Sequence, residues 1–276
     1  MIIVKEFPSQ QFQSKEELFK ALRENKSTLI AQKKGINKEA DSVFYFVGIE
    51  NEKGEVSKAE NVNTNNINKI KAKLVINTTN LIDSHGDMHV KGLWKKSIQE
   101  QKNTLLLQEH KMTFDHIISD NILVSTKDIK WSDLGYNYEG KTQALVFDAE
   151  ITKDRNNFMF EQYSKGYVKE HSVGMRYVKL DLAINSDSKY DKEEKAIWDK
   201  YYPEVVNKEI ADEHGYFWVV TEAKAIEGSA VVKGSNHATP TISIEAVNDD
   251  TSKEQTQITE PSIDTQKKKN YYSLLN

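Results

Sequence analysis

The stretch "KEHSVGMRY", residues 169 to 177, predicts a β-strand in which one serine needs an explanation. In an extended chain successive side chains leave opposite faces, so Ser172 shares one face with Gly174 and Arg176. The other face carries His171 together with larger apolar and aromatic side chains, and it reads as the packed face. His171 therefore points away from Ser172, and the face that carries Ser172 is unusually polar for an interior strand.

The composition is that of a globular protein with polar additions. The chain has 276 residues, of which 38% are hydrophobic, and it has no cysteine, which excludes disulfides and thiolate chemistry. No apolar run approaches the roughly 18 to 20 residues that span a bilayer, and the N-terminal sequence does not resemble a secretory signal. The net charge of −4 gives no general attraction to nucleic acid. We therefore expect no membrane and no specific nucleic-acid partner.

The chain divides by composition into four segments. Residues 1–50 predict a helical leader followed by a strand, with Ser14 and Glu17 in the spacing of a capping box at the first helix. Residues 51–68 form a polar linker, and residues 246–276 are low in apolar side chains, as in a flexible tail.

Residues 69–245 alternate short runs rich in Val, Ile, Tyr and Phe with Gly, Asn and Asp. This pattern predicts a mainly β domain with flanking helices, of the α+β class, built as a barrel or a sandwich. Helices are expected near residues 92–101 and 154–165. A charged insertion, residues 185–213, is expected to hold one more helix, which ends near Pro203.

The sequence "HGDMH" places His85 and His89 at the i, i+4 spacing of a helical zinc pair. The glutamate that such a motif needs after the first histidine is replaced by Gly86, a poor residue for a helix interior. A hairpin leading into a helix at Trp94 is the preferred interpretation. A metal-dependent hydrolase is kept as the less favoured alternative.

Three other residues have the chemistry of a nucleophilic hydrolase. His110 ends the apolar run "TLLLQEH", so it lies at the mouth of a predicted core strand, where a base would be well placed. Glu227 falls within the strongly apolar "WVVTEAKAIEGSAVV" and needs a partner, because burying an unpaired carboxylate is costly. With Ser172 these residues supply a nucleophile, a base and an orienting acid, in the chain order His, Ser, Glu.

Residues 71–240 resemble the tailed-phage prohead maturation proteases, a family of serine peptidases similar in fold to the herpesvirus assembly protease. Four blocks occur in the family's order: "DSHGDMHVKGLWKKSI", "LLLQEHKM", "HSVGMRY" and "AIEGSAVVKGSNHATP". They resemble its Asp…Gly-Asp…Gly opening into a helix, its strand ending in the catalytic histidine, its Ser-x-Gly nucleophile strand and its Glu-x-Ser strand. Gly228 departs from the pattern, because the family often has a larger apolar residue there.

Carried over residue by residue, the resemblance makes Ser172 the nucleophile, His110 the base and Glu227 the third member, with His214 and Glu222 as alternatives for the acid. It also implies a small closed or partly open β-barrel. Ser172 would then face the substrate cleft, and Gly174 would leave the backbone clear for a substrate strand.

The activity implied by the resemblance is that of a serine endopeptidase that needs no cofactor and no metal. Its substrates would be the scaffold or major capsid protein and the chain itself, inside an assembling procapsid in the host cytoplasm; a homo-oligomer is left open. Self-cleavage is expected after Ala246 or within residues 51–68, whose composition does not support packing. The alternative from another class is a non-enzymatic capsid- or scaffold-binding protein on the same fold.

Overall fold

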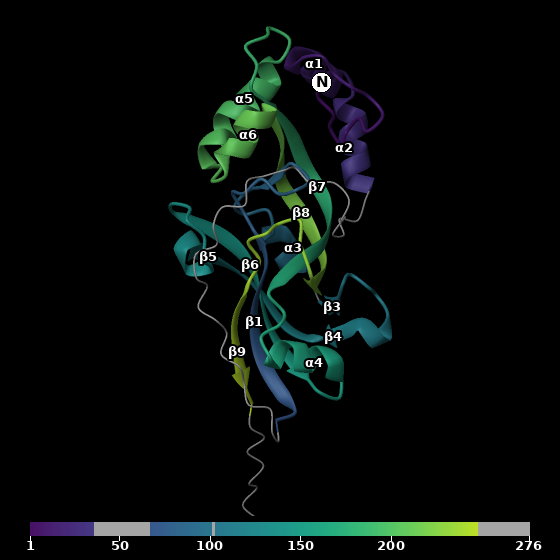
Figure 1. The fold of residues 1–276 in the computed structure, drawn as a ribbon, viewed down its shortest axis with the longest axis vertical. Helices are drawn as coiled ribbons and strands as arrows, with labels where there is room; N and C mark the ends of the chain where they lie inside the picture. The colour runs from purple at the N-terminus through teal and green to yellow at the C-terminus, as the bar shows by residue number, and fades with distance from the viewer. Residues whose placement is uncertain (36–66, 101–102, 248–276) are drawn as a thin grey trace, which may run out of the picture.

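The computed structural model describes residues 1–35, 67–100 and 103–247, which form a mixed α+β fold of two sheets with helices gathered largely at one end (Figure 1). The strands are β1 (Lys69–Thr78), β2 (Asp87–His89), β3 (Leu106–Gln108), β4 (Ile117–Ser119), β5 (Asn121–Lys130), β6 (Lys141–Thr152), β7 (Glu170–Ile184), β8 (Tyr216–Val231) and β9 (Thr241–Ala246). The helices are α1 (Lys15–Glu24), α2 (Lys26–Gly35), α3 (Lys95–Glu100), α4 (Asn157–Ser164), α5 (Lys192–Tyr201) and α6 (Lys208–His214), with short 3-10 turns at Phe114–His116, Trp131–Leu134 and Tyr202–Glu204.

Strand β8 is the centre of the larger sheet. Along one edge it pairs in parallel with β2 and, further on, with β3, to which β4 is added; along the other edge it pairs antiparallel with β7. The second sheet is antiparallel and has the order β5-β6-β1-β9. The two sheets are not closed into a barrel. The expected α+β class is confirmed, whereas the expected barrel is not.

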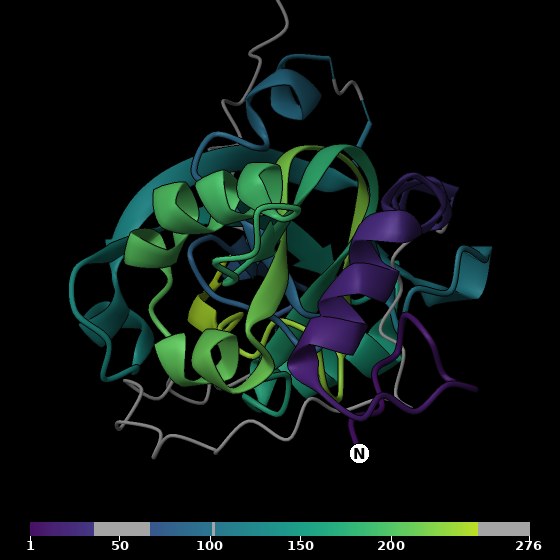
Figure 2. The same cartoon turned by 90° about the horizontal axis from the view of Figure 1, so that it is seen from above.

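The N-terminal helices belong to the main core. The Ser14 cap is present, since its hydroxyl accepts from Glu17 N, while the Glu17 carboxylate accepts from Gln13 N, one residue before the N-cap. Phe12, Leu18 and Leu22 are buried in the same apolar cluster as Trp218 of β8. Figure 2, viewed from above, shows α1 and α2 beside the β7–β8 ribbon, with α5 and α6 also at this end. Residues 1–35 thus pack onto the larger sheet.

Three ion pairs also join α1 and α2 to the rest of the molecule. In each pair the basic group comes from the N-terminal helices and the acidic partner is almost fully buried. The pairs are Arg23–Asp191, Lys26–Glu194 (2.7 Å) and Lys33–Asp87 (2.5 Å). Buried carboxylates require such partners, because an isolated buried charge is very costly.

Several local expectations are met. Helices α3 and α4 lie within the two predicted ranges, and the helix expected in the insertion is α5, which is followed by a 3-10 turn with Pro203. A second helix, α6, begins in the insertion and was not predicted. "HGDMH" forms a tight turn and strand β2, with Ile82 bridged to Met88 and Gly86 at φ 69°. The strand predicted before residue 50, most of the 51–68 linker, and nearly all of the tail lie outside the described residues. None of the described helices has the length and apolar character needed to cross a membrane.

Candidate active site

A strained turn presents His110. Strand β3 runs parallel to β8 and ends at Gln108, and a turn follows that is closed by a hydrogen bond from Lys111 N to Gln108 O (3.1 Å). Both central residues have left-handed backbones, with φ 52° at Glu109 and φ 57° at His110. This conformation costs on the order of 1 to 3 kcal/mol for a residue other than glycine and persists only where surrounding contacts hold it. One such contact is the hydrogen bond from Glu109 N to Ala230 O (2.9 Å).

His110 and Glu227 are in direct contact. The distance from His110 Nδ1 to Glu227 Oε1 is 2.6 Å, and the two side chains are only 5% and 4% exposed. Because a carboxylate only accepts hydrogen bonds, Nδ1 carries a proton, and in the neutral imidazole Nε2 then presents its lone pair. Nε2 is buried and has no hydrogen-bond partner among the described residues. This is the arrangement of a general base whose tautomer is fixed by an acid.

Ser229 completes this cluster. Its hydroxyl donates to Glu227 Oε2 (2.6 Å) and accepts from the backbone N of His110 (3.1 Å). The side chain is fully buried. The sequence identifies Ser229 only as the serine of the Glu-x-Ser match. The signal available was its position two residues after Glu227, which places both side chains on the same face of β8.

Ser172 lies on the neighbouring strand, directly opposite Ser229 in the β7–β8 register. Opposed residues of an antiparallel pair project to the same face, so Ser172 is on the face that carries Glu227 and Ser229. Ser172 is 7% exposed. The structure therefore joins His110 to Glu227 by a hydrogen bond and places Ser172 on the adjacent strand. A hydrogen bond between Ser172 and His110 Nε2 is not formed here.

The predicted role of Gly174 needs a correction. Gly174 is opposite Glu227, and a β-carbon built at this glycine would lie 2.0 Å from Glu227 Oε1. The space is filled by the acid of the cluster, so it is not left for a substrate strand. Gly174 is required here because no larger side chain leaves room for that carboxylate.

The departure at Gly228 also has a packing cause. A β-carbon at Gly228 would lie 2.5 Å from Cε2 of Phe147, a buried residue of β6. Phe147 of the second sheet therefore occupies the volume that a larger residue at position 228 would need. A glycine at position 228 therefore allows the contact between the two sheets.

His171 is a core residue, as its place on the packed face of β7 predicts. Its Nδ1 donates to the carbonyl of Thr239 (3.0 Å), so its Nε2 accepts from the Tyr163 hydroxyl (3.0 Å). Complete burial lowers the pKa of His171 to about 4, although the Thr239 carbonyl opposes the shift. Both ring nitrogens are in use, and neither faces Ser172.

The helical zinc pair is not present. His89 is in strand β2, and its two ring nitrogens lie 2.9 Å from Asn77 Nδ2 and 3.2 Å from the Tyr177 hydroxyl. No cluster of three or more His, Cys, Asp or Glu that could hold a metal ion occurs within the described part of the chain. The metal-dependent alternative thus loses the geometry on which it depended.

The two alternative acids have other partners. The Glu222 carboxylate lies 2.6 Å from Lys179 Nζ and 3.7 Å from Lys96 Nζ. His214 ends α6, and its ring lies against Tyr216. Of the three residues considered for the acid, Glu227 is the one that bonds to His110.

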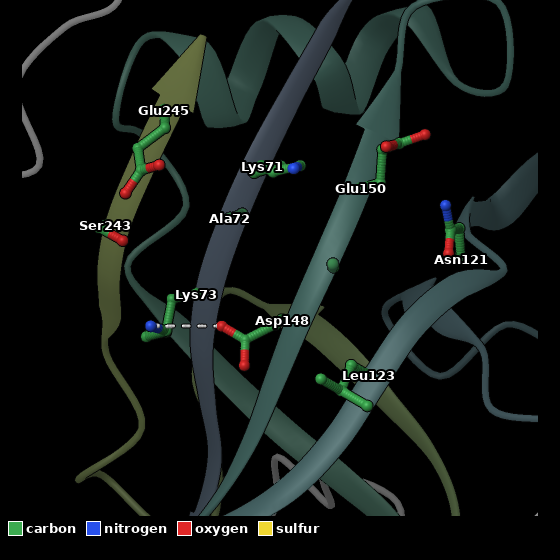
Figure 3. A pocket seen from close by; sticks show the side chains of 10 residues that line it. Lys71, Ala72, Lys73, Asn121, Leu123, Asp148, Glu150, Ser243 and Glu245 are labelled. Carbon is green, nitrogen blue, oxygen red and sulfur yellow. Dashed lines mark ion pairs between the residues drawn. The ribbon is translucent and has the colours of Figure 1, made fainter. Parts of the chain in front are cut away.

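A separate hollow lies on the outer face of the smaller sheet (Figure 3). It has a volume of about 420 Å³ and includes the Lys73–Asp148 ion pair (3.4 Å). Its lining residues are Lys71, Ala72, Lys73, Asn121, Leu123, Asp148, Ala149, Glu150, Ser243 and Glu245. The hollow shares no residue with the His110 cluster, and its charged groups point away from the sheet toward solvent. We assign no function to it.

Comparison of the chain with protein-family models, with curated proteins and with solved structures found no significant match. The resemblance to the prohead proteases therefore stays a prediction from the sequence blocks. The functional interpretation depends on the geometry of the site.

Proposed function

We propose that this chain is a serine endopeptidase with Ser172 as nucleophile, His110 as base and Glu227 as acid. The observation that carries the proposal is the buried His110–Glu227 pair with its free Nε2, together with the register that puts Ser172 on the face of the neighbouring strand that carries Glu227. A buried ring nitrogen without a partner is costly, and a reacting hydroxyl proton is what it would accept.

In the proposed mechanism, Ser172 Oγ attacks the carbonyl carbon of the peptide while its proton passes to His110 Nε2. Glu227 keeps the Nδ1 proton in place and stabilises the imidazolium that forms. The imidazolium then protonates the leaving amine, which frees the new N-terminus. Water, deprotonated by His110, hydrolyses the acyl-enzyme and restores Ser172. This step requires the Ser172 hydroxyl to come within hydrogen-bond distance of Nε2 when substrate binds, and catalytic hydrogen bonds often tighten only in the substrate complex.

The wider proposal follows the resemblance. The substrates are procapsid proteins, namely the scaffold or the major capsid protein, and the chain itself, in a phage procapsid assembling in the host cytoplasm. The partly open barrel of the herpesvirus assembly protease is part of the same proposal. The second candidate function is a non-enzymatic capsid- or scaffold-binding protein, which would keep the fold without needing a free Nε2.

A fluorophosphonate probe, which reacts with activated serines, tests the proposal. We expect the wild-type chain to be labelled once, at Ser172, and to shorten with time when followed by intact-mass spectrometry. Ser172→Ala should show neither effect. Ser164→Ala, which removes another buried hydroxyl on α4, is the matched control and should behave as the wild type. A folded wild-type chain that is neither labelled nor shortened would favour the binding protein instead.

A further inference from the structure

Ser229 differs from other buried serines of this chain in what its hydroxyl binds. The Ser164 hydroxyl donates to the backbone carbonyl of Phe160 (2.7 Å), a common way to satisfy a buried hydroxyl. Ser229 instead donates to a carboxylate and accepts from the backbone of the residue that carries the base. Its two partners are thus the proposed acid and the proposed base.

The directions of these hydrogen bonds are fixed by chemistry. A hydroxyl has one proton to donate, and the Glu227 carboxylate can only accept, so the proton lies on the Ser229–Glu227 bond. The backbone N of His110 can only donate, so the oxygen of the same hydroxyl accepts this hydrogen bond through a lone pair. The contacts form a closed ring, from the imidazole to Oε1, from Oε2 to Ser229, and from Ser229 back to the main chain of His110.

This ring of hydrogen bonds restricts two motions, the rotation of the Glu227 carboxylate and the movement of the turn that carries His110. Each oxygen of the Glu227 carboxylate has its own partner, so the group cannot rotate about its terminal bond without losing one of them. The bond to His110 N also holds the left-handed turn at Glu109 and His110, which is strained by itself. Charge-assisted bonds of this kind are among the stronger ones in proteins.

We infer that Ser229 is a positioning residue of the site, which holds the acid and the turn of the base in a single arrangement. The inference rests on the proposed function for its effect on catalysis, while the positioning itself concerns His110 and Glu227 alone. Ser229 does not touch the reacting atoms, and it acts on the reaction through these two residues.

The first measurement is the rate of labelling by the fluorophosphonate, with kcat and KM for a cleaved peptide. For Ser229→Ala we expect both the labelling rate and kcat to fall roughly tenfold to a hundredfold, with KM unchanged, because small misplacements of catalytic groups cost rate in this range. Ser229→Cys, which fills the same space with a weaker donor, should fall in between. Ser164→Ala is the control and should match the wild type.

The second measurement does not depend on activity. In the Ser172→Ala background, the proton on His110 Nδ1 should give a downfield NMR resonance, because it lies in a short hydrogen bond to Glu227. Adding Ser229→Ala should move this resonance upfield or broaden it, and adding Ser164→Ala should leave it unchanged. If Ser229→Ala does not fold, Ser229→Cys takes its place in both measurements.

The outcomes separate the two proposals. A wild-type chain that is never labelled overturns the proposed function, and the NMR comparison then still decides whether Ser229 holds the pair. A wild-type chain that is labelled, with Ser229→Ala labelled equally fast and an unchanged resonance, overturns the positioning role and leaves the protease proposal standing. A rise in KM with unchanged kcat would also contradict the positioning role.

Discussion

Two buried histidines lie along the same edge of β8, and they are held in different ways. His89 of β2 is part of a series of hydrogen bonds in which both of its ring nitrogens take part. The Asn77 amide donates to Nδ1, Nε2 donates to the Tyr177 hydroxyl, and this hydroxyl donates to Asp87, which is paired with Lys33. This series of hydrogen bonds ends at the Asp87–Lys33 ion pair, so His89 links β1, β2, β7 and α2.

His110, further along the same edge, has one engaged ring nitrogen and one buried nitrogen without a partner among the described residues. An unsatisfied buried polar atom costs about 1 to 3 kcal/mol, so folding alone would not favour it. The turn that carries His110 is also strained, whereas His89 lies in a regular strand. The difference supports the proposal that His89 stabilises the fold and that His110 acts as the base.

The largest expected effect comes from exchanging the two histidines for glutamine in turn. His110→Gln should reduce labelling and cleavage on the order of 10⁴-fold, because the base is lost, while the free energy of unfolding changes less than in His89→Gln, because the glutamine amide can still donate to Glu227 and the unpaired Nε2 is removed. His89→Gln should do the reverse, lowering the free energy of unfolding by roughly 1 to 3 kcal/mol because the chain from Asn77 to Tyr177 is broken. Urea denaturation and the labelling rate of the folded fraction measure the two effects.

Equal loss of labelling in the two variants, at conditions where both are folded, would remove the distinction between a structural and a chemical histidine. Ser164→Ala again serves as a control for both measurements.

The next largest expected effect is the pH dependence of the free energy of unfolding that comes from His171, a histidine that stabilises the fold. His171, like His89, has both ring nitrogens engaged, and its burial lowers the pKa to about 4 in the folded chain, against about 6.5 when unfolded. Between these two pKa values His171 is protonated in the unfolded chain and neutral in the folded chain. The free energy of unfolding should therefore fall as the pH falls from 6.5 to 4, by about 3 kcal/mol in total.

In His171→Gln the free energy of unfolding should lose this part of its pH dependence. The measured quantity is the difference in unfolding free energy between wild type and variant, followed by urea denaturation from pH 7 to pH 4.5. The wild-type advantage should shrink as the pH is lowered. A difference that stays constant over this range would mean that His171 does not stay neutral when buried.

The sequence could predict the strand faces but not the contacts between strands. Alternation along β7 correctly separated Ser172 from His171, and the need of a buried carboxylate for a partner correctly linked Glu227 to a histidine. Periodicity fixes which face of one strand a residue occupies. Periodicity does not predict the register that sets Ser172 opposite Ser229, because this register depends on how β7 and β8 are aligned along their whole length.

Other features depended on residues distant in the sequence. The pairing of Lys33 with Asp87 joins an N-terminal helix to a strand that follows the undescribed segment, and neither local sequence identifies its partner. The space beside Gly174 is filled by Glu227 of β8, a contact that the sequence of β7 alone does not predict. The left-handed turn at Glu109 and His110 gave no clear signal either, since it contains none of the Gly, Asn and Asp residues that are typical of such turns.

The smallest expected effect tests whether the carboxylate of Glu227 must stay where it is. In Gly174→Ala the new β-carbon would lie 2.0 Å from Oε1, so the carboxylate must move away from His110 Nδ1. The backbone at Gly174 does not have a positive φ, and an alanine would by itself favour the folded chain by about 0.4 to 1 kcal/mol. Because the shift breaks buried hydrogen bonds, we expect the free energy of unfolding to fall by roughly 1 to 3 kcal/mol and labelling of the folded fraction to be about tenfold slower, since the imidazole loses its orienting partner. Gly35→Ala, where nothing lies within 4 Å, is the control for the substitution itself. Wild-type labelling by Gly174→Ala would show that His110 works without a fixed acid, and the contrast with His89 would then depend on the free Nε2 alone.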